Sequence, residues 1–192
     1  MRKDVKVLAM VLAGGKGERL HPLTEHRAKP AVPFGCLYRL IDFVLSNLVN
    51  SGIHQIYVLT QYKAQSLLRH LQQGWVGTYP MNGLFILPVP AQMRVGEGWY
   101  LGTADAIYQN IYLIQQIKPD LVLVFGADHV YFMDVGRMIH YHLEKGAEVT
   151  VSMIPCPITE CHQFGVAVVD EAWRIKSFQE KVSHPTPIPG HP

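Results

Sequence analysis

Short apolar runs alternate along the chain with segments whose apolar residues recur at helical spacing. A short, continuous, β-branched run bounded by glycine, proline or polar residues predicts a buried strand. Such runs occupy residues 5–12, 53–60, 84–87, 121–125 and 147–153. Helical spacing ended by Gly52, Gly74, Pro119 or Gly146 predicts helices over residues 39–51, 63–73, 103–117 and 135–145.

This alternation determines the expected fold class, because strand–helix–strand units place parallel strands side by side under helices. We expect an α/β fold, Rossmann-like, with an open, mostly parallel sheet and helices on both faces. The segments 164–169 and 174–179, joined around Asp170-Glu171-Ala172, predict an antiparallel β-hairpin near the C-terminus. We expect one domain over residues 1–183, followed by a loop or linker tail over 184–192 that is rich in proline and histidine.

The composition narrows the class of protein. Of the 192 residues, 48% are hydrophobic and 17% charged, as in soluble globular domains. The net charge of +2 is too small to indicate a nucleic-acid partner, and the apolar runs are too short to span a membrane. We expect no signal peptide and a cytoplasmic location. Cys36, Cys156 and Cys161 are expected to be free thiols, and the last two with His162 match no common zinc spacing.

A glycine-rich turn follows the first predicted strand and is the first candidate site. Ala13, Gly14, Gly15 and Gly17 lie in it, and such turns direct backbone N–H groups at phosphate oxygens. Arg19 and Lys29 add positive charge that can grip phosphate. A tight surface turn with solvated charges is the alternative. The turn is neither a dinucleotide fingerprint nor a P-loop, because the required third glycine and the Gly-Lys-Ser/Thr ending are missing.

Asp128 is the second candidate. It follows the apolar run at 121–125, so its carboxylate is expected at the edge of the sheet where parallel strands end and ligands bind. A carboxylate there suits Mg²⁺ held mainly by phosphate oxygens. The alternative is an aspartate that caps the next segment.

Three segments carry a family resemblance. The run from Leu12 to Leu20, followed by Pro22-Leu23-Thr24 and Ala28-Lys29-Pro30-Ala31-Val32-Pro33, is similar to the opening signature of sugar nucleotidyltransferases. The segment 98–107, Gly-Trp-Tyr-Leu-Gly-Thr-Ala-Asp-Ala-Ile, resembles the glucose-1-phosphate adenylyltransferase branch, as does Arg-Leu-Ile-Asp-Phe at 39–43. The resemblance extends from about residue 5 to residue 181.

The resemblance implies transfer of AMP from ATP to α-D-glucose 1-phosphate, giving ADP-glucose and pyrophosphate for glycogen- or starch-type synthesis. It implies Mg²⁺ as cofactor and a homo-oligomer, a tetramer, in the full-length form. Arg19, Lys29 and Asp128 would be catalytic, with Asp128 the metal ligand. Ala13, Gly14, Gly15, Gly17 and Arg19 would hold the ATP phosphates, and Gln92 and Gly102 would contact adenine. Thr103 would cap its helix and favour an anionic group there. Glucose 1-phosphate would contact Tyr100, Gly165, Glu180 and Lys181.

The sequence departs from the family pattern at a few positions. The usual Ala-Gly-Asp-His is Gly126-Ala127-Asp128-His129, which is expected to place a methyl group beside the metal site. The usual Phe-Gly-Gly-Lys is Phe-Gly-Cys-Leu at 34–37, and His26 stands where several relatives have a basic residue tied to activator binding. Relatives continue beyond this length, so we interpret the chain as an incomplete, N-terminal portion of the catalytic domain.

Other readings remain open. The nucleotide could be another NTP, although the segment 99–107 argues against it. The chain could also be a nucleotide-binding or subunit-interaction fragment without catalysis. A dehydrogenase-type module is the weakest reading.

Overall fold

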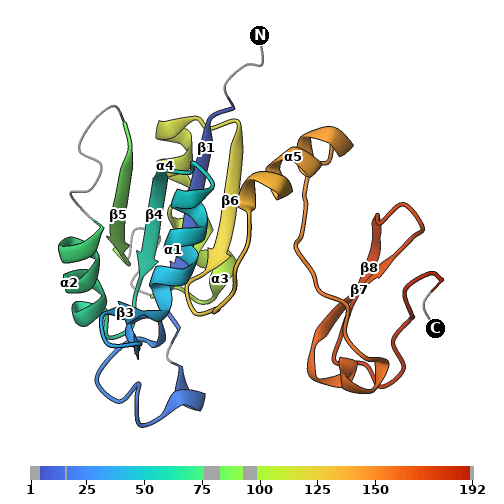
Figure 1. Cartoon of the computed structure of the whole chain (residues 1–192), viewed down its shortest axis with the longest axis horizontal. Coiled ribbons are helices and arrows are strands. Elements are labelled where there is room, and N and C mark those ends of the chain that lie inside the picture. Colours follow the sequence, from blue (N-terminus) through green and yellow to red (C-terminus); the bar gives the residue numbers. More distant parts are fainter. Residues whose placement is uncertain (1–4, 16, 76–82, 93–98, 191–192) are drawn as a thin grey trace. The chain divides into compact units, whose positions relative to one another are not determined.

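A four-stranded parallel sheet forms the centre of the first of two compact units, Met1–Gly146 and Ala147–Pro192. The computed structural model describes residues 5–15, 17–75, 83–92 and 99–190. The strands of the sheet are β1 (Val7–Ala13), β4 (Gln55–Thr60), β5 (Phe85–Pro90) and β6 (Leu121–Gly126), in the order β5-β4-β1-β6 (Figure 1). All three neighbouring pairs are parallel, which confirms the expected α/β class.

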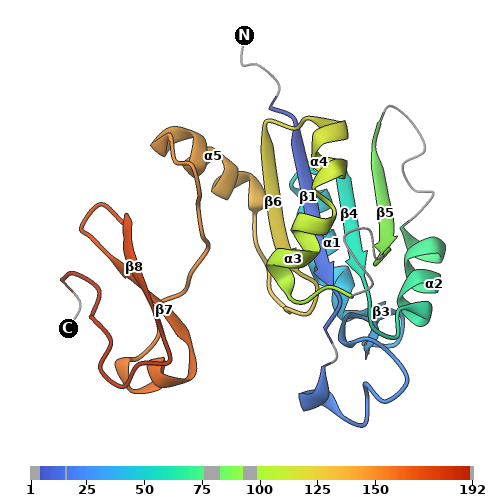
Figure 2. The ribbon, with the colours of Figure 1, turned by 180° about the vertical axis from the view of Figure 1, so that it is seen from behind.

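Helices cover both faces of this sheet, as the sequence predicted. Alternate residues of a strand point to opposite faces, so β1 contributes to two cores. Ala9 and Val11 lie in the core that contains α1 (Leu40–Asn50), α2 (Gln65–Gly74) and Val135 of α5 (Val135–Lys145). Leu8 and Met10 lie in the core that contains α3 (Thr103–Gln109) and α4 (Ile111–Ile117). The two views from opposite sides show α1 on one face and α3 and α4 on the other (Figure 2).

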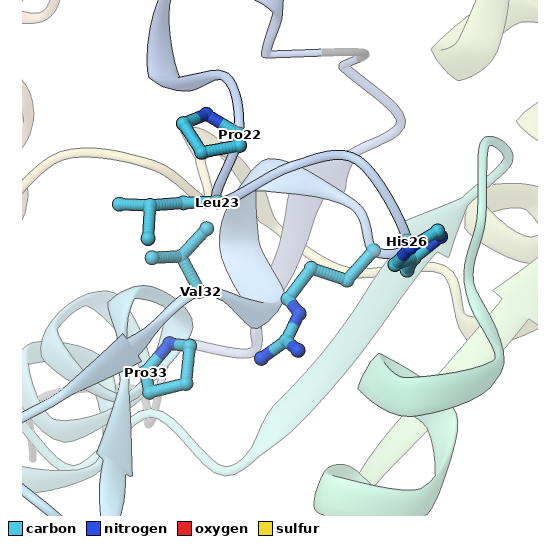
Figure 3. A pocket seen from close by; sticks show the side chains of 6 residues that line it. Pro22, Leu23, His26, Val32 and Pro33 are labelled. Atoms are coloured by element: carbon cyan, nitrogen blue, oxygen red, sulfur yellow. The ribbon is translucent and has the colours of Figure 1, made fainter.

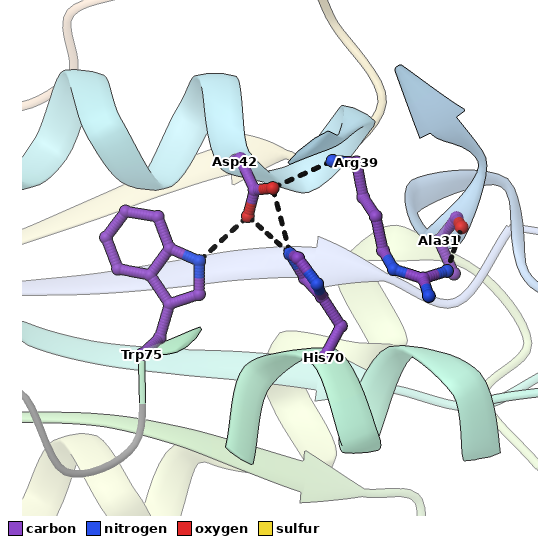
Figure 4. Close-up of polar contacts among 5 residues, drawn as sticks. All are labelled: Ala31, Arg39, Asp42, His70 and Trp75. Atoms are coloured by element: carbon purple, nitrogen blue, oxygen red, sulfur yellow. Dashed lines mark hydrogen bonds and ion pairs between the residues drawn. The ribbon is translucent and has the colours of Figure 1, made fainter. Parts of the chain in front are cut away.

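A buried carboxylate joins α1 to α2. Asp42, 5% exposed, accepts a hydrogen bond from the backbone N–H of Arg39 at 2.8 Å, which caps α1. Its other oxygen accepts the indole N–H of Trp75 at 2.8 Å and lies 2.7 Å from His70 Nε2 (Figure 4). Three partners satisfy a charge that would otherwise be costly to bury. The cluster therefore fixes the start of α1, directly after the loop that carries the candidate site.

Short elements shape the connection between β1 and α1. Two 3₁₀ turns, η1 (Glu18–Leu20) and η2 (Lys29–Ala31), precede a small hairpin of β2 (Pro33–Phe34) and β3 (Tyr38–Arg39). Ala28 and Ala31 are fully buried, and Arg39 donates a side-chain hydrogen bond to the Ala31 carbonyl at 2.5 Å. This long connection is thus anchored to the core, although it contains little regular structure.

The sequence predicted one helix over 103–117, but the structure has two. Asn110 leaves the helical conformation at φ −108° and ψ 15° and separates α3 from α4. Its buried side chain donates hydrogen bonds to the Ala106 carbonyl and to the Tyr100 hydroxyl. Asparagine competes in this way with the backbone ladder of a helix, which is the physical reason for the break.

The strand predictions need two further corrections. β5 extends through Pro88 and Pro90, which is tolerated because β5 is an edge strand in the described sheet. The run at 147–153 forms no strand, and its Val149, Val151 and Met153 are exposed. A strand needs a partner for its backbone groups, and none of the strands in the described ranges pairs with this run. Within the described part of the chain, β6 is the other edge strand and pairs with β1, and its Val122 and Val124 are exposed.

The second unit contains the expected hairpin. The 3₁₀ helix η3 (Ile158–Gln163) leads into β7 (Gly165–Val169), which pairs antiparallel with β8 (Ile175–Glu180). Asp170 closes the turn by accepting hydrogen bonds from the N–H groups of Ala172 and Arg174, and it forms an ion pair with Lys176.

Among the helices of the described ranges, none has the length and apolar character required to cross a membrane.

Candidate functional site

The strand order places a switch point between β1 and β6. From β1 the chain continues to β4 and β5 on one side, then returns to β6 on the other side of β1. In open parallel sheets, ligands bind where the connections diverge, beyond the carboxyl ends of the strands. The glycine-rich turn follows β1 and Asp128 follows β6, so both candidate segments lie at this end. Leu12 pairs with Gly126, and the Ala127 N–H donates to the Leu12 carbonyl at 3.0 Å.

The glycines of the turn have different environments. A Cβ on Gly15 would meet no atom within 4 Å, so its exposed backbone is open to a ligand. A Cβ on Gly14 would lie 3.3 Å from the Cβ of Gln61, which follows β4. Gly17 has a left-handed φ of 69°, and a Cβ there would lie 2.6 Å from the Cβ of Lys29. Gly17 therefore permits both the turn and the close approach of Lys29.

Thr24 holds this turn in place, a role that the sequence pattern did not indicate. The hydroxyl of the buried Thr24 donates to the Gly17 carbonyl at 2.9 Å. The hydrogen bond fixes the backbone of the glycine-rich turn at Gly17. Arg19, on η1, is exposed. The hydrogen bond from Thr24 gives the turn a defined conformation, which either a binding loop or an ordinary surface turn can have.

Lys29 and Asp128 meet across the switch point. Their charged groups, Nζ and Oδ2, are 2.8 Å apart, although the residues are 99 positions apart in the sequence. The side chains are 30% and 36% exposed, so the pair is accessible to a ligand. An ammonium and a carboxylate side by side provide one group for phosphate oxygens and one for a cation.

Gly126 and Ala127 place the carboxylate. A Cβ on Gly126 would lie 3.2 Å from Asp128 Oδ1, so the glycine leaves room for the carboxylate beside the backbone. Ala127 is fully buried in the core between the sheet and α1. The Ala127 side chain packs into this core, directly before the Asp128 carboxylate in the chain.

The connection between β1 and α1 contains a shallow cavity of about 320 Å³. It is lined by Pro22, Leu23, His26, Arg27, Val32 and Pro33 (Figure 3). His26 is exposed, and its Nε2 lies 3.9 Å from the Glu25 carboxylate. The lining is mainly apolar and belongs to the same connection between β1 and α1 as Gly17 and Lys29.

The segment predicted to contact nucleotide and sugar leads into α3. Gly102 is the N-cap of α3, so the prediction that Thr103 is the cap is wrong: Thr103 is the first helical residue. The side chain of Asp105, in the first turn of α3, accepts a hydrogen bond from the Leu101 N–H at 2.9 Å and so stabilises the start of the helix. Gly102 and Thr103 are exposed.

Tyr100 and Gln92 have contrasting surroundings. Tyr100 packs against the core that contains α3 and α4, and burial raises the pKa of its phenol. Its hydroxyl accepts a hydrogen bond from buried Asn110, a support that nothing in the sequence pattern indicated. Gln92 follows β5 and is exposed.

The remaining predicted sugar contacts belong to the second unit. Gly165 faces Glu180 across the hairpin, and a Cβ on Gly165 would lie 2.8 Å from Glu180 Oε2. Lys181 adopts a left-handed φ of 50°, and its N–H donates to the Phe164 carbonyl at 2.9 Å. A lysine held in this conformation costs about 1 kcal/mol or more, a feature concentrated at functional sites.

The described residues can supply only part of a metal site. No three histidine, cysteine, aspartate or glutamate side chains in the described ranges converge in a way that could hold a metal ion. Asp128 offers one carboxylate whose Oδ2 already faces an ammonium. This fits a Mg²⁺ ion bound chiefly by nucleotide phosphates, which needs one or two protein carboxylates. It does not fit a metal bound by protein ligands alone.

Comparison with known proteins agrees with the geometry. Residues 8–188 match the family model described as nucleotidyl transferase. A glucose-1-phosphate adenylyltransferase of Thermus caldophilus is 56% identical over 192 residues, covering 98% of this chain and 46% of the relative. That of Bifidobacterium longum (strain NCC 2705) is 57% identical over 194 residues, covering 100% and 47%. The chain spans about half the length of these curated relatives. Since the family model covers nearly every residue, including all of the switch-point site, the chain belongs to the nucleotidyl transferase family.

Proposed function

We propose that this chain forms the nucleotide-binding part of a glucose-1-phosphate adenylyltransferase. The reaction transfers AMP from ATP to α-D-glucose 1-phosphate and yields ADP-glucose and pyrophosphate. The relatives named above support the choice of substrates. With these relatives we also propose a role in α-glucan synthesis, a cytoplasmic location and a homotetramer for the full-length protein.

The observation that carries the proposal is the 2.8 Å pair of Lys29 and Asp128 beside the open backbone of Gly15. The attacking phosphate and the triphosphate are both anionic, so the protein must mainly position them and neutralise charge. A basic group, an acidic group that can hold a cation, and the exposed backbone of Gly15 after the same strand end suit that requirement.

Each residue has a defined task in this proposal. The N–H groups at Gly14 and Gly15 bind phosphate oxygens, and Arg19 adds charge at the same turn. Lys29 turns from Asp128 to the reacting phosphates when nucleotide is bound. Gln92 and Gly102 contact adenine, and Thr103 contributes at the start of α3. Tyr100, Gly165, Glu180 and Lys181 bind glucose 1-phosphate.

Asp128 would hold Mg²⁺ together with the nucleotide phosphates. When bound, the metal supplies charge neutralisation at the phosphates. The protein's own part is to keep the carboxylate at the strand end, which the space at Gly126 and the 2.8 Å contact with Lys29 support.

The test is pyrophosphate release by the purified chain with Mg²⁺, glucose 1-phosphate and either ATP or UTP. Release with ATP and not with UTP is the expected result. Release with UTP alone would exclude the adenylyl specificity. Lys29→Met should abolish release, whereas Lys145→Met, which removes a lysine from the last turn of α5 in the same unit, should leave it unchanged.

A binding-only role is the second candidate, because the chain covers 46% of its relative from Thermus caldophilus. It predicts that ATP raises the melting temperature of the chain, in a manner that requires Lys29, without pyrophosphate release. If ATP changes neither melting nor turnover, both candidates are excluded for this chain.

A further inference from the structure

Two cysteines of the second unit lie in contact. The Sγ atoms of Cys156 and Cys161 are 3.3 Å apart, in the turn that leads through η3 into β7. A disulfide would require these atoms to approach to about 2.05 Å, a movement of about 1.3 Å. The third cysteine, Cys36, belongs to the β2–β3 hairpin of the first unit and is exposed. The prediction of three free thiols is confirmed, and the structure adds that two of them are in contact.

The two thiols differ in character. Cys161 is 6% exposed, and its pKa is raised, first by its hydrogen bond with Cys156 and then by burial. Cys161 also lies 3.5 Å from the Pro157 carbonyl, to which its S–H can donate. Cys156 is only half-buried. Because the thiolate is the nucleophile, the more accessible Cys156 is suited to react first and the protonated Cys161 second.

We propose that Cys156 and Cys161 form a peroxide-sensitive dithiol that closes reversibly to an intramolecular disulfide. The Cys156 thiolate attacks one oxygen of hydrogen peroxide, the O–O bond breaks, and, with one proton, sulfenic acid and water are formed. The Cys161 sulfur then attacks the Cys156 sulfur and loses its proton, and the hydroxyl leaves as a second water molecule. Both thiols are oxidised by two electrons in total, and one peroxide is reduced.

The position of the pair gives the bond a structural consequence. The Cys161 carbonyl accepts the Phe164 N–H at 3.0 Å, and the Phe164 carbonyl accepts the Lys181 N–H. A disulfide across the turn would therefore stiffen the segment at which β7 begins and β8 ends. This inference goes beyond the proposed function and does not depend on it. If the disulfide also changed the binding of glucose 1-phosphate at Gly165, Glu180 and Lys181, that further effect would rest on the proposed function.

The test uses the full chain carrying Cys36→Ser, so that two thiols remain. Treatment with hydrogen peroxide should remove both alkylatable thiols, with a mass loss of two hydrogen atoms and no dimer, and dithiothreitol should restore both. In the Cys36→Ser, Cys161→Ser protein, Cys156 has no internal partner, so peroxide should convert it to sulfinic or sulfonic acid or to a mixed disulfide. Retention of both thiols, conversion to sulfinic acid without a disulfide, or covalent dimers would overturn the proposal.

A second readout separates the bond from its consequence. Amide hydrogen exchange at Phe164 and Lys181 should slow on oxidation of the Cys36→Ser protein and recover on reduction. The doubly substituted Cys36→Ser, Cys161→Ser protein is the control and should show no slowing. Disulfide formation with unchanged exchange would refute the stiffening of the hairpin. Both readouts are independent of enzymatic turnover, so a failure of the proposed function would leave them interpretable.

Discussion

Replacing Gly17 by alanine tests how the glycine-rich turn positions Lys29. The residue has a φ of 69°, and the new Cβ would lie 2.6 Å from the Lys29 Cβ and 3.1 Å from Thr24 Cγ2. A left-handed alanine costs about 1–2 kcal/mol, and overpacking costs about 1–3 kcal/mol. The lower entropy of the unfolded alanine variant returns about 0.4–1 kcal/mol. We therefore expect Gly17→Ala to lose about 3 kcal/mol of unfolding free energy.

Thermal melting measures this loss, which corresponds to a decrease of about 10 °C for a unit of this size. Displaced Lys29 should also lose its contact with Asp128, so ATP should no longer raise the melting temperature. Gly15→Ala is the matched control, because its Cβ meets no atom within 4 Å. It should melt like the wild type. It should bind ATP about tenfold more weakly, because its methyl group occupies the open side of the turn and keeps a phosphate oxygen from the backbone N–H. Wild-type melting of Gly17→Ala, or wild-type ATP binding by Gly15→Ala, would refute the reasoning.

Further predictions concern single groups. Asp128→Asn should abolish ATP-dependent pyrophosphate release while changing unfolding free energy by about 1 kcal/mol or less, since the pair is part-exposed; unchanged turnover would exclude the metal role. Asp42→Ala should cost about 3 kcal/mol in denaturant unfolding, because it leaves buried donors without an acceptor. Cys36→Gly should gain about 0.5 kcal/mol in the same assay, as Cys36 has a φ of 63°. Hydrogen bonds from the Arg174 N–H and the Lys176 ammonium lower the pKa of Asp170. The stabilisation from Asp170 is present above the ordinary aspartate pKa and is lost as pH falls through the lowered value. It should appear in acid as a smaller protection of the Arg174 amide, measured as its exchange rate relative to the intrinsic rate at the same pH.

Local chemistry was read correctly where a residue's conformation depends on its neighbours in the chain. Gly52 and Gly146 adopt left-handed φ values of 79° and 55° just after α1 and α5, where the sequence placed helix ends. The hairpin of β7 and β8 was likewise predicted, because two segments joined by a short polar turn are neighbours in the chain and can pair with each other.

Partners distant in the sequence were the main source of error. The run at 147–153 has strand-like composition, yet its state depends on a second strand to share its backbone hydrogen bonds. The burial of the Ala127 methyl group likewise follows from the pairing of β6 with β1, a strand distant in the sequence. The break at Asn110 has a more local origin, because its side chain donates to Ala106 and Tyr100, four and ten positions before it.

The sequence by itself determined the parallel α/β class, the glycine-rich turn and the choice of Lys29 and Asp128 as candidates. Periodicity suffices for the fold class because it reflects local propensity and the alternation of buried faces. The choice of Lys29 and Asp128 rested in addition on the family resemblance of the segments that contain them. Only the tertiary structure decided that Lys29 and Asp128 lie 2.8 Å apart, that Asp42 joins α1 to α2, and that Cys156 contacts Cys161. Those contacts arise when the strand order and loop packing bring side chains together in space, and one-dimensional spacing carries no direct measure of that distance.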